Sequence, residues 1–287
     1  MNTFYDISAK IDQATVELLT AVDAVLKDIG VSFFLVGARA RDIVLTSIFN
    51  IPIVRATLDY DFAVSIADWN KYEEIVDSFV QTGTFQRDPH VAHRLIHGKI
   101  GKVDFVPFGR IRNPDGEVRW PPDFLTVFKT SGFQEAYDTA ITVRLRAVPP
   151  LDFKVCSPAG LAILKVLAWS GRMDPLDKRK DAEDLGTIMY HYADIIGVDG
   201  VDADLMGDDF DYELAGARML GRHIAKIAHP DTFGRLLHIL LPETGSDGYR
   251  LAQDLISVIA YEDDPAAFGK AMRLLQAMVQ GLQEQAK

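Results

Sequence analysis

The sequence predicts an α+β protein built from two domains. From Val31 to about Val148, short apolar stretches of strand length alternate with amphipathic stretches of helix length, a pattern typical of a sheet with helices packed on it. From Ser157 onward, the apolar spacing is helical almost throughout. Val148-Pro149-Pro150 interrupts both patterns, so we expect one domain over residues 1–150 and an all-helical domain over residues 151–287.

The elements of the first domain follow from these stretches and from the residues that bound them. Gly30 and Gly37 each follow an apolar stretch and favour a turn, and Asp68 is a favourable N-cap. Helices are predicted over Ile7–Lys27, Ala40–Phe49 and Asp68–Val80. Strands are predicted over Ser32–Val36, Thr57–Ile66, Thr84–Arg87, His93–His97, Lys102–Pro107 and Ile141–Leu145, with a turn and a break in Arg112–Pro122.

The second domain is predicted to open with a helix at Ser157-Pro158. Serine at the cap and proline in the first turn are strong signals for a helix start, and Ser170-Gly171 is the expected end. Residues 197–211 form an acidic loop that does not match the calcium-binding spacing of an EF-hand. Further helices are predicted over Lys178–Tyr192, Asp211–Ala228, Pro230–Leu241, Tyr249–Ala260 and Pro265–Glu284.

Composition excludes several classes of protein. The 287 residues are 48% hydrophobic and 25% charged, which suits a globular chain with a sizeable core. The single cysteine, Cys156, cannot form an internal disulfide. Neither a signal peptide nor an apolar run long enough to cross a membrane is evident, so we expect a cytoplasmic protein. The net charge of −11 disfavours a dedicated nucleic-acid binder, although a local basic site remains compatible with it.

A strand with two acids is the most informative local pattern. Side chains alternate along Leu58–Val64, so Asp59 and Asp61 share one face while the apolar residues between them share the other. Two close carboxylates repel each other, and a divalent cation turns that repulsion into a binding site, since Mg²⁺ prefers hard oxygen ligands. The alternative is a half-exposed strand with two solvated acids.

Two further segments favour the metal site. Asp104 lies within the apolar strand Lys102–Val106, where an unpaired charge is costly, so it is either a third metal carboxylate or half of a buried ion pair. Gly37, Ala38 and Arg39 lie where a predicted strand turns into a helix, a junction that exposes backbone N–H groups to an anion.

Gly37-Ala38, Arg55–Asp61 and Val103-Asp104-Phe105 together resemble the pattern of polymerase-β-like nucleotidyltransferases. The resemblance implies a mixed sheet flanked by helices, two Mg²⁺ ions held by Asp59, Asp61 and Asp104, and a nucleoside triphosphate as substrate. Superfamily members have Gly-Ser at the turn, where the serine holds phosphate. Ala38 lacks that hydroxyl, so Arg39, Thr57 or backbone N–H groups would replace it.

A second motif narrows the resemblance to the AbiEii/AbiGii-type nucleotidyltransferase toxins. The motif comprises Lys165, Arg172, and the acids Asp181 and Asp184, and with the first motif it covers roughly residues 31–190. It implies that Lys165 is catalytic and that Arg172, Asp181 and Asp184 help to bind the nucleotide. From spacing alone, Lys165 and Arg172 share a helix face and so do the two acids, which favours a solvated salt-bridge network.

The acceptor of the nucleotide stays open at this stage. The resemblance implies an RNA such as a tRNA 3′ end, or a protein hydroxyl, in a type IV toxin–antitoxin or abortive-infection system with a cognate antitoxin. Two alternatives are a small-molecule nucleotidyltransferase of the aminoglycoside type and a non-catalytic nucleotide-binding module. A basic, stacking-capable acceptor site could be formed by His93, Arg94, Arg110, Arg112, Arg119 and Trp120.

Overall fold

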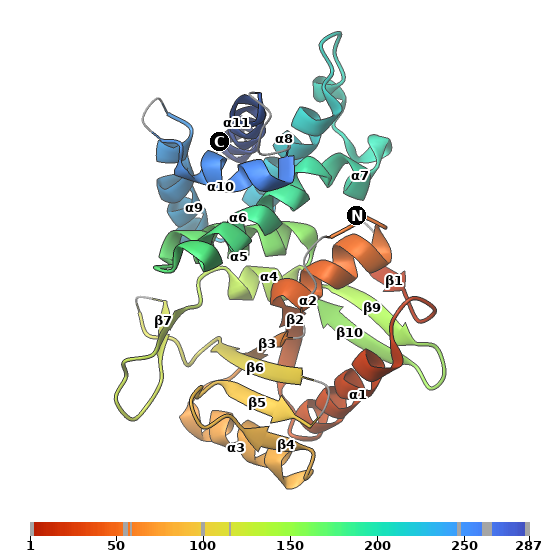
Figure 1. Cartoon of the computed structure of the whole chain (residues 1–287), viewed down its shortest axis with the longest axis vertical. Coiled ribbons are helices and arrows are strands. Elements are labelled where there is room, and N and C mark those ends of the chain that lie inside the picture. Colours follow the sequence, from red (N-terminus) through yellow and green to blue (C-terminus); the bar gives the residue numbers. More distant parts are fainter. Residues whose placement is uncertain are drawn as a thin grey trace. The chain divides into compact units, whose positions relative to one another are not determined.

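The computed structural model describes residues 3–53, 57, 59–98, 101–114, 116–245, 248–259 and 266–284. The chain forms two compact units, one ending at Ser157 and the other beginning at Pro158 (Figure 1). The first unit combines a mixed sheet with helices and the second is helical, so the predicted α+β class is confirmed. No helix in this described part of the chain combines the length and apolarity needed to cross a bilayer.

One mixed sheet organises the described residues of the first unit. Its strand order is β1-β9-β10-β2-β3-β6-β5-β4. β3 runs parallel to β6 and antiparallel to β2, and β5 runs antiparallel to β6. The strands are β1 (Phe4–Asp6), β2 (Ser32–Val36), β3 (Asp59–Ser65), β4 (Phe85–Arg87), β5 (Arg94–His97), β6 (Gly101–Phe108), β9 (Ile141–Arg146) and β10 (Leu151–Val155).

Two helices of the first unit begin at aspartates that cap them. Asp12 accepts a hydrogen bond from the Thr15 backbone N–H at the start of α1 (Gln13–Asp28), and Asp68 does the same for Lys71 at α3 (Trp69–Gln81). The remaining helices are α2 (Gly37–Asp42), the π-helix η1 (Ile43–Ile48) and α4 (Phe133–Asp138). The predicted cap at Asp68 is therefore confirmed.

The two faces of the sheet differ in what covers them. On one face Phe62 and Phe105 stack in register, and Phe79 of α3 packs on Phe105. The opposite face, which carries Asp59, Asp61 and Asp104, is covered at its far end by α4. There Tyr137 contacts Phe34 and Phe108. We call this second face the acidic face.

Four strands of the first unit are absent from the predicted set. β1 and β10 extend the sheet on either side of β9, and β10 also pairs with β2, so residues 151–155 belong to the first unit rather than to the helical one. The segment predicted as a turn and a break instead contributes β7 (Glu117–Arg119), which pairs with β8 (Val127–Lys129) in a separate hairpin.

The described elements of the second unit are all α-helices or short 3-10 turns. α5 begins at Pro158 and ends at Gly171, as predicted, whereas α6 starts at Pro175 because Asp174 caps it. Arg222 binds Asp202 and Asp204, so the acidic loop is tied to a helix rather than fully solvated. The helices are α5 (Pro158–Gly171), α6 (Pro175–Tyr190), α7 (Tyr192–Ile196), α8 (Tyr212–Ile227), α9 (Pro230–Glu243), α10 (Arg250–Ile259) and α11 (Ala267–Glu284), with 3-10 turns at Val198–Gly200 and Ala203–Leu205.

Candidate functional site

The acids of β3 lie on one face of the strand, as their spacing predicts. Tyr60 between them is 2% exposed and points to the opposite face, where its hydroxyl hydrogen-bonds the Thr15 hydroxyl. Asp59 and Asp61 are both partly exposed. Their Cα atoms are two strand positions apart, about 6.7 Å, which leaves room for both carboxylates to reach one cation.

Strand register brings a third acid and a base beside Asp61. Asp61 of β3 is paired with Asp104 of the parallel strand β6, and Asp104 is paired with Arg94 of β5. Paired residues on neighbouring strands point to the same face and lie about 4.8 Å apart. Asp61, Asp104 and Arg94 therefore form one row across three strands of the acidic face, which we call the Asp–Asp–Arg row.

Gly37 lies directly against this row. Its φ of +67° is a left-handed conformation that favours glycine, and a Cβ at this position would overlap the Oδ2 atom of Asp61. Val36, the residue before it, is the register partner of Asp61. The glycine turn and the acids of β3, far apart in the sequence, are thus neighbours in the structure.

Asp104 is held by Arg94 through two hydrogen bonds. The Nε and Nη2 atoms of Arg94 donate to Oδ1 and Oδ2 of Asp104 at 2.7 and 2.8 Å. The hydrogen bonds to Asp104 raise the pKa of Arg94 above its ordinary value, so the guanidinium stays charged. Of the two roles open to Asp104, the structure shows the buried ion pair, and the prediction that Asp104 binds metal stays a prediction.

His93 is a second side chain that lies close to Asp104. Its Nε2 lies 3.7 Å from Oδ2 of Asp104. Burial lowers the pKa of His93, and Arg94 lowers it further although Asp104 raises it, so the imidazole is neutral at pH 7. Arg94 is therefore the cation that balances Asp104.

Lys102 is a residue of the acidic face to which sequence reasoning gave no role. It is exposed and is the register partner of Asp59. The signal was present in the sequence, because Lys102 and Asp104 are two positions apart on one strand and must share a face. Its relation to Asp59 depends on the β3–β6 register, which local sequence does not reveal.

Arg39 and Thr57, predicted to contact phosphate, lie at the start of β3. Nη2 of Arg39 donates to the Thr57 carbonyl at 2.8 Å, and the guanidinium lies over the Tyr60 ring. The Thr57 hydroxyl accepts a hydrogen bond from the Asp59 backbone N–H. Because Tyr60 faces away from the acids, Arg39 lies on the other side of the strand from the carboxylates, while Ala38 follows Gly37 in the first turn of α2.

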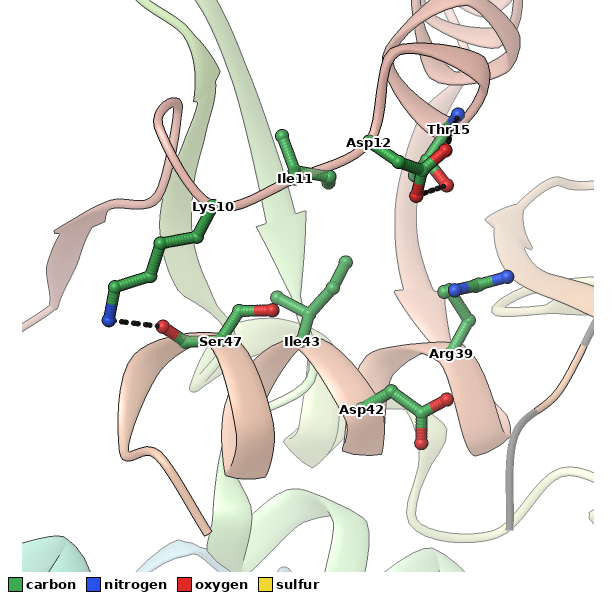
Figure 2. Close-up of a pocket in the computed structure, with 8 residues that line it drawn as sticks. All are labelled: Lys10, Ile11, Asp12, Thr15, Arg39, Asp42, Ile43 and Ser47. Carbon is green, nitrogen blue, oxygen red and sulfur yellow. Dashed lines mark hydrogen bonds between the residues drawn. The ribbon is translucent and has the colours of Figure 1, made fainter. Parts of the chain in front are cut away.

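Arg39 also lines a small polar pocket of about 70 Å³, between the segment leading into α1 and the helical run of α2 and η1 (Figure 2). Asp12 lies across from Arg39, and on the other side Lys10 donates to the Ser47 carbonyl at 2.9 Å. Burial raises the pKa of Asp12, but hydrogen bonds from Thr15 and the charge of Arg39 lower it to a net value below the ordinary one. The pocket mixes both charges and lies apart from the acidic face.

Residues of the second motif form a compact ionic cluster within the second unit. Lys165 Nζ lies 2.8 Å from Asp181 and 2.6 Å from Asp184, and Arg172 lies 3.1 Å from the other oxygen of Asp181. Burial lowers the pKa of Lys165, and Asp184 and Asp181 raise it by more, so the net pKa is above its ordinary value. The cluster is the salt-bridge network that the spacing allowed, with Lys165, Asp181 and Asp184 buried and Arg172 half exposed.

The proposed acceptor residues are divided between two settings. Trp120 is 4% exposed and packs edge-on against Trp69, Tyr72 and His93. Arg119 is exposed and pairs with Glu117. Arg110 and Arg112 are exposed. Trp120 is thus a core residue and is not open for stacking.

The acidic face fits a divalent cation in part. Within the described residues, no three His, Cys, Asp or Glu side chains are grouped so that they could hold a metal ion. Asp59 and Asp61 nevertheless offer two sets of hard oxygen donors, and Mg²⁺ is commonly held by one or two carboxylates together with water and substrate phosphates. The pair therefore suits a divalent cation whose other ligands are water and phosphate oxygens.

Comparisons with known proteins give a distant likeness only. No protein-family model matches the sequence, and no curated protein matches it. Among solved structures, an antigenic nucleotidyltransferase-like protein from Paracoccidioides brasiliensis is similar with a TM-score of 0.43 and 14% identity, over 79% of this chain and 93% of that chain. A tRNA-processing enzyme in an apo form is similar with a TM-score of 0.22 and 13% identity, over 84% and 77% of the two chains.

Proposed function

We propose that this protein is a metal-dependent nucleotidyltransferase that transfers a nucleoside monophosphate from a nucleoside triphosphate to a hydroxyl group. The observation that carries the proposal is the meeting of Gly37, Asp61 and Asp104 on the acidic face, with Asp59 beside them. By itself, a pair of acids on one strand is also explained as two solvated side chains of a half-exposed strand. A tight glycine turn placed against one of the acids, with a third acid in register, is the arrangement that the resemblance implies.

In this reaction the acceptor oxygen bonds to the α-phosphorus, the bond from the α-phosphorus to the bridging oxygen breaks, and pyrophosphate leaves. The acceptor hydroxyl gives its proton to water. Asp59 and Asp61 would hold a divalent cation, which would supply positive charge to the phosphate oxygens and the acceptor oxygen. Gly37 lets the chain pass close to Asp61, and Arg94 orients the carboxylate of Asp104. Catalysis would come from positioning and charge rather than from a covalent intermediate.

We further propose a toxin-like role with RNA or protein as the acceptor. The support is the resemblance of the motif Lys165, Arg172, Asp181 and Asp184 to the AbiEii/AbiGii-type toxins. A second support is that the four residues contact one another within the second unit, where Lys165 pairs with Asp181 and Asp184 and Arg172 pairs with Asp181. The proposal includes a cognate antitoxin as a partner of this protein.

The test is an incubation of the full chain with Mg²⁺ and each α-labelled nucleoside triphosphate, in the presence of total RNA, cell protein or an aminoglycoside. We expect label to enter one of these acceptors. Asp59→Asn and Asp61→Asn should each lower the rate on the order of 10³-fold, as expected when about 4 kcal/mol of metal-derived stabilisation is lost.

The matched control is Asp152→Asn, which removes a strand carboxylate of β10 in the same unit and should leave the rate unchanged. Absence of transfer to every acceptor, or full activity in folded Asp59→Asn, would contradict the proposal. Nucleotide binding without turnover would favour a non-catalytic module. Growth arrest by the wild type but not by Asp61→Asn would support the toxin-like role, and antibiotic resistance without arrest would replace it with a small-molecule acceptor.

A further inference from the structure

Arg94 lies where its charge can act beyond its contact with Asp104. It is the third member of the Asp–Asp–Arg row, on the strand next to Asp104 and two strands from Asp61. Its side chain is 19% exposed and that of Asp104 is 9% exposed, so the pair is largely removed from water. A permanent positive charge is therefore built into the acidic face.

Both carboxylate oxygens of Asp104 are used by this cation. Nε and Nη2 of Arg94 approach Oδ1 and Oδ2 in the bidentate geometry that makes arginine–carboxylate pairs strong. A metal ion that took Asp104 as a ligand would have to displace the guanidinium and leave Arg94 without its partner in a poorly solvated place. Removing one member of a buried pair is costly for this reason.

The charge of Arg94 also acts on the other acids. Asp59 contributes to raising the pKa of Arg94, after the larger effects of Asp104, which places Asp59 within its electrostatic range. Arginine has five N–H donors in a rigid fork, and Asp104 engages those on Nε and Nη2. The remaining donors can bind a phosphate oxygen, a contact for which arginine is well suited.

We infer that Arg94 takes the place of a second metal ion, so that the acidic face binds one divalent cation through Asp59 and Asp61, and Arg94 supplies the second positive charge toward the triphosphate. This inference rests on the proposed function, because it assumes that Asp59 and Asp61 hold a metal. Asp104 is then a positioning residue that fixes the guanidinium. The sequence resemblance implies two bound ions, whereas this inference assigns one bound ion and one arginine.

The test counts Mn²⁺ ions bound by the full chain, using the electron paramagnetic resonance signal of free Mn²⁺ during a titration. We expect the wild type to saturate at one ion. Asp104→Asn should also bind one ion, since Asp104 is not a ligand. Arg94→Gln should bind two ions, because Asp104 becomes available.

The matched control is Arg144→Gln. Arg144 forms the same bidentate pair with Asp152 across β9 and β10, at 2.8 and 2.9 Å, and its loss should leave one ion bound. Arg94→Lys retains the charge and should also bind one ion. Circular dichroism confirms that each variant is folded, and Asp104→Asn still tests the inference if Arg94→Gln does not fold.

The outcomes separate this inference from the proposed function. Two ions bound to the wild type would overturn the inference while leaving the transferase proposal intact. A folded Arg94→Gln that binds only one ion would also overturn it, since Arg94 would then not exclude the second ion. No ion bound to the wild type at millimolar Mn²⁺ would contradict the metal site itself and with it both proposals.

Discussion

Gly37 places the turn after β2 directly against Asp61 of β3. Two separate requirements meet at this position, a left-handed backbone and the absence of a side chain beside Asp61. Several other glycines with a left-handed backbone have the first requirement alone. Gly30, for example, has a φ of +68° with open space around it.

We predict that Gly37→Ala lowers the free energy of unfolding by about 3 kcal/mol. A left-handed conformation costs a side-chain-bearing residue about 1–2 kcal/mol, and the overlap with Asp61 adds an overpacking cost of about 1–3 kcal/mol. Gly30→Ala is the matched control and should cost only the first part. Urea denaturation of both variants checks this, and equal losses of stability in the two would show that Gly37 and Asp61 are not in close contact.

At the scale of elements, the pairing of α5 with α6 depends on Lys165. Its side chain is 12% exposed, and it contacts two aspartates of α6 that are 5% and 3% exposed. Without the lysine, Asp181 and Asp184 would face each other in a buried place. The cluster therefore has a structural role in the second unit, beside the catalytic role that the sequence resemblance implies.

We predict that Lys165→Met destabilises the protein by about 3–5 kcal/mol at pH 7, since it removes the buried cation that pairs with both Asp181 and Asp184. The pKa of Lys165 is raised above its ordinary value of 10.5, so its stabilisation is fully present below that pH and is lost as the pH rises through the higher pKa of the folded state. The difference between wild type and variant should therefore shrink above pH 10.5.

Thermal or urea unfolding between pH 7 and pH 11.5 tests this dependence. Lys27→Met is the control, because Lys27 is 64% exposed and its pair with Asp23 should contribute less than about 1 kcal/mol. A Lys165→Met variant as stable as the wild type would show that the cluster is not a buried ion pair in solution.

Elements with strong local signals could be predicted from the sequence. The alternation of acids and apolar residues in β3, the lone acid in β6 and the Ser157-Pro158 helix start all lie where expected. The start of α1 was predicted too early. Ile7 is apolar and buried, which fits a helix pattern, but its N–H donates to the Arg144 carbonyl and so continues the contact of β1 with β9.

Elements that depend on distant partners could not be predicted. β1 has three residues and exists through its pairing with β9, and β10 follows two prolines that suggested a boundary. The pair of Arg94 with Asp104 has the same origin. It requires the antiparallel register of β5 with β6, which is fixed by the whole sheet rather than by the residues near Arg94.

At the scale of the whole molecule, the two units divide the predicted site residues between them. Asp59, Asp61, Asp104 and Gly37 belong to the unit that ends at Ser157, and Lys165 belongs to the unit that begins at Pro158. The carboxylates, their strand register and the glycine turn are all contained in the first unit. All residues of the proposed metal site therefore lie in the first unit.

The location of a bound Mn²⁺ ion tests the central claim most directly. Anomalous diffraction from crystals grown with Mn²⁺ and a nucleoside triphosphate analogue that resists cleavage between the α- and β-phosphates would locate it. We predict a peak that contacts an oxygen of Asp59, an oxygen of Asp61 and the phosphates, with Arg94 still bound to Asp104. Ordered nucleotide with no peak at Asp59 and Asp61, or a peak elsewhere in the chain, would contradict the proposed site.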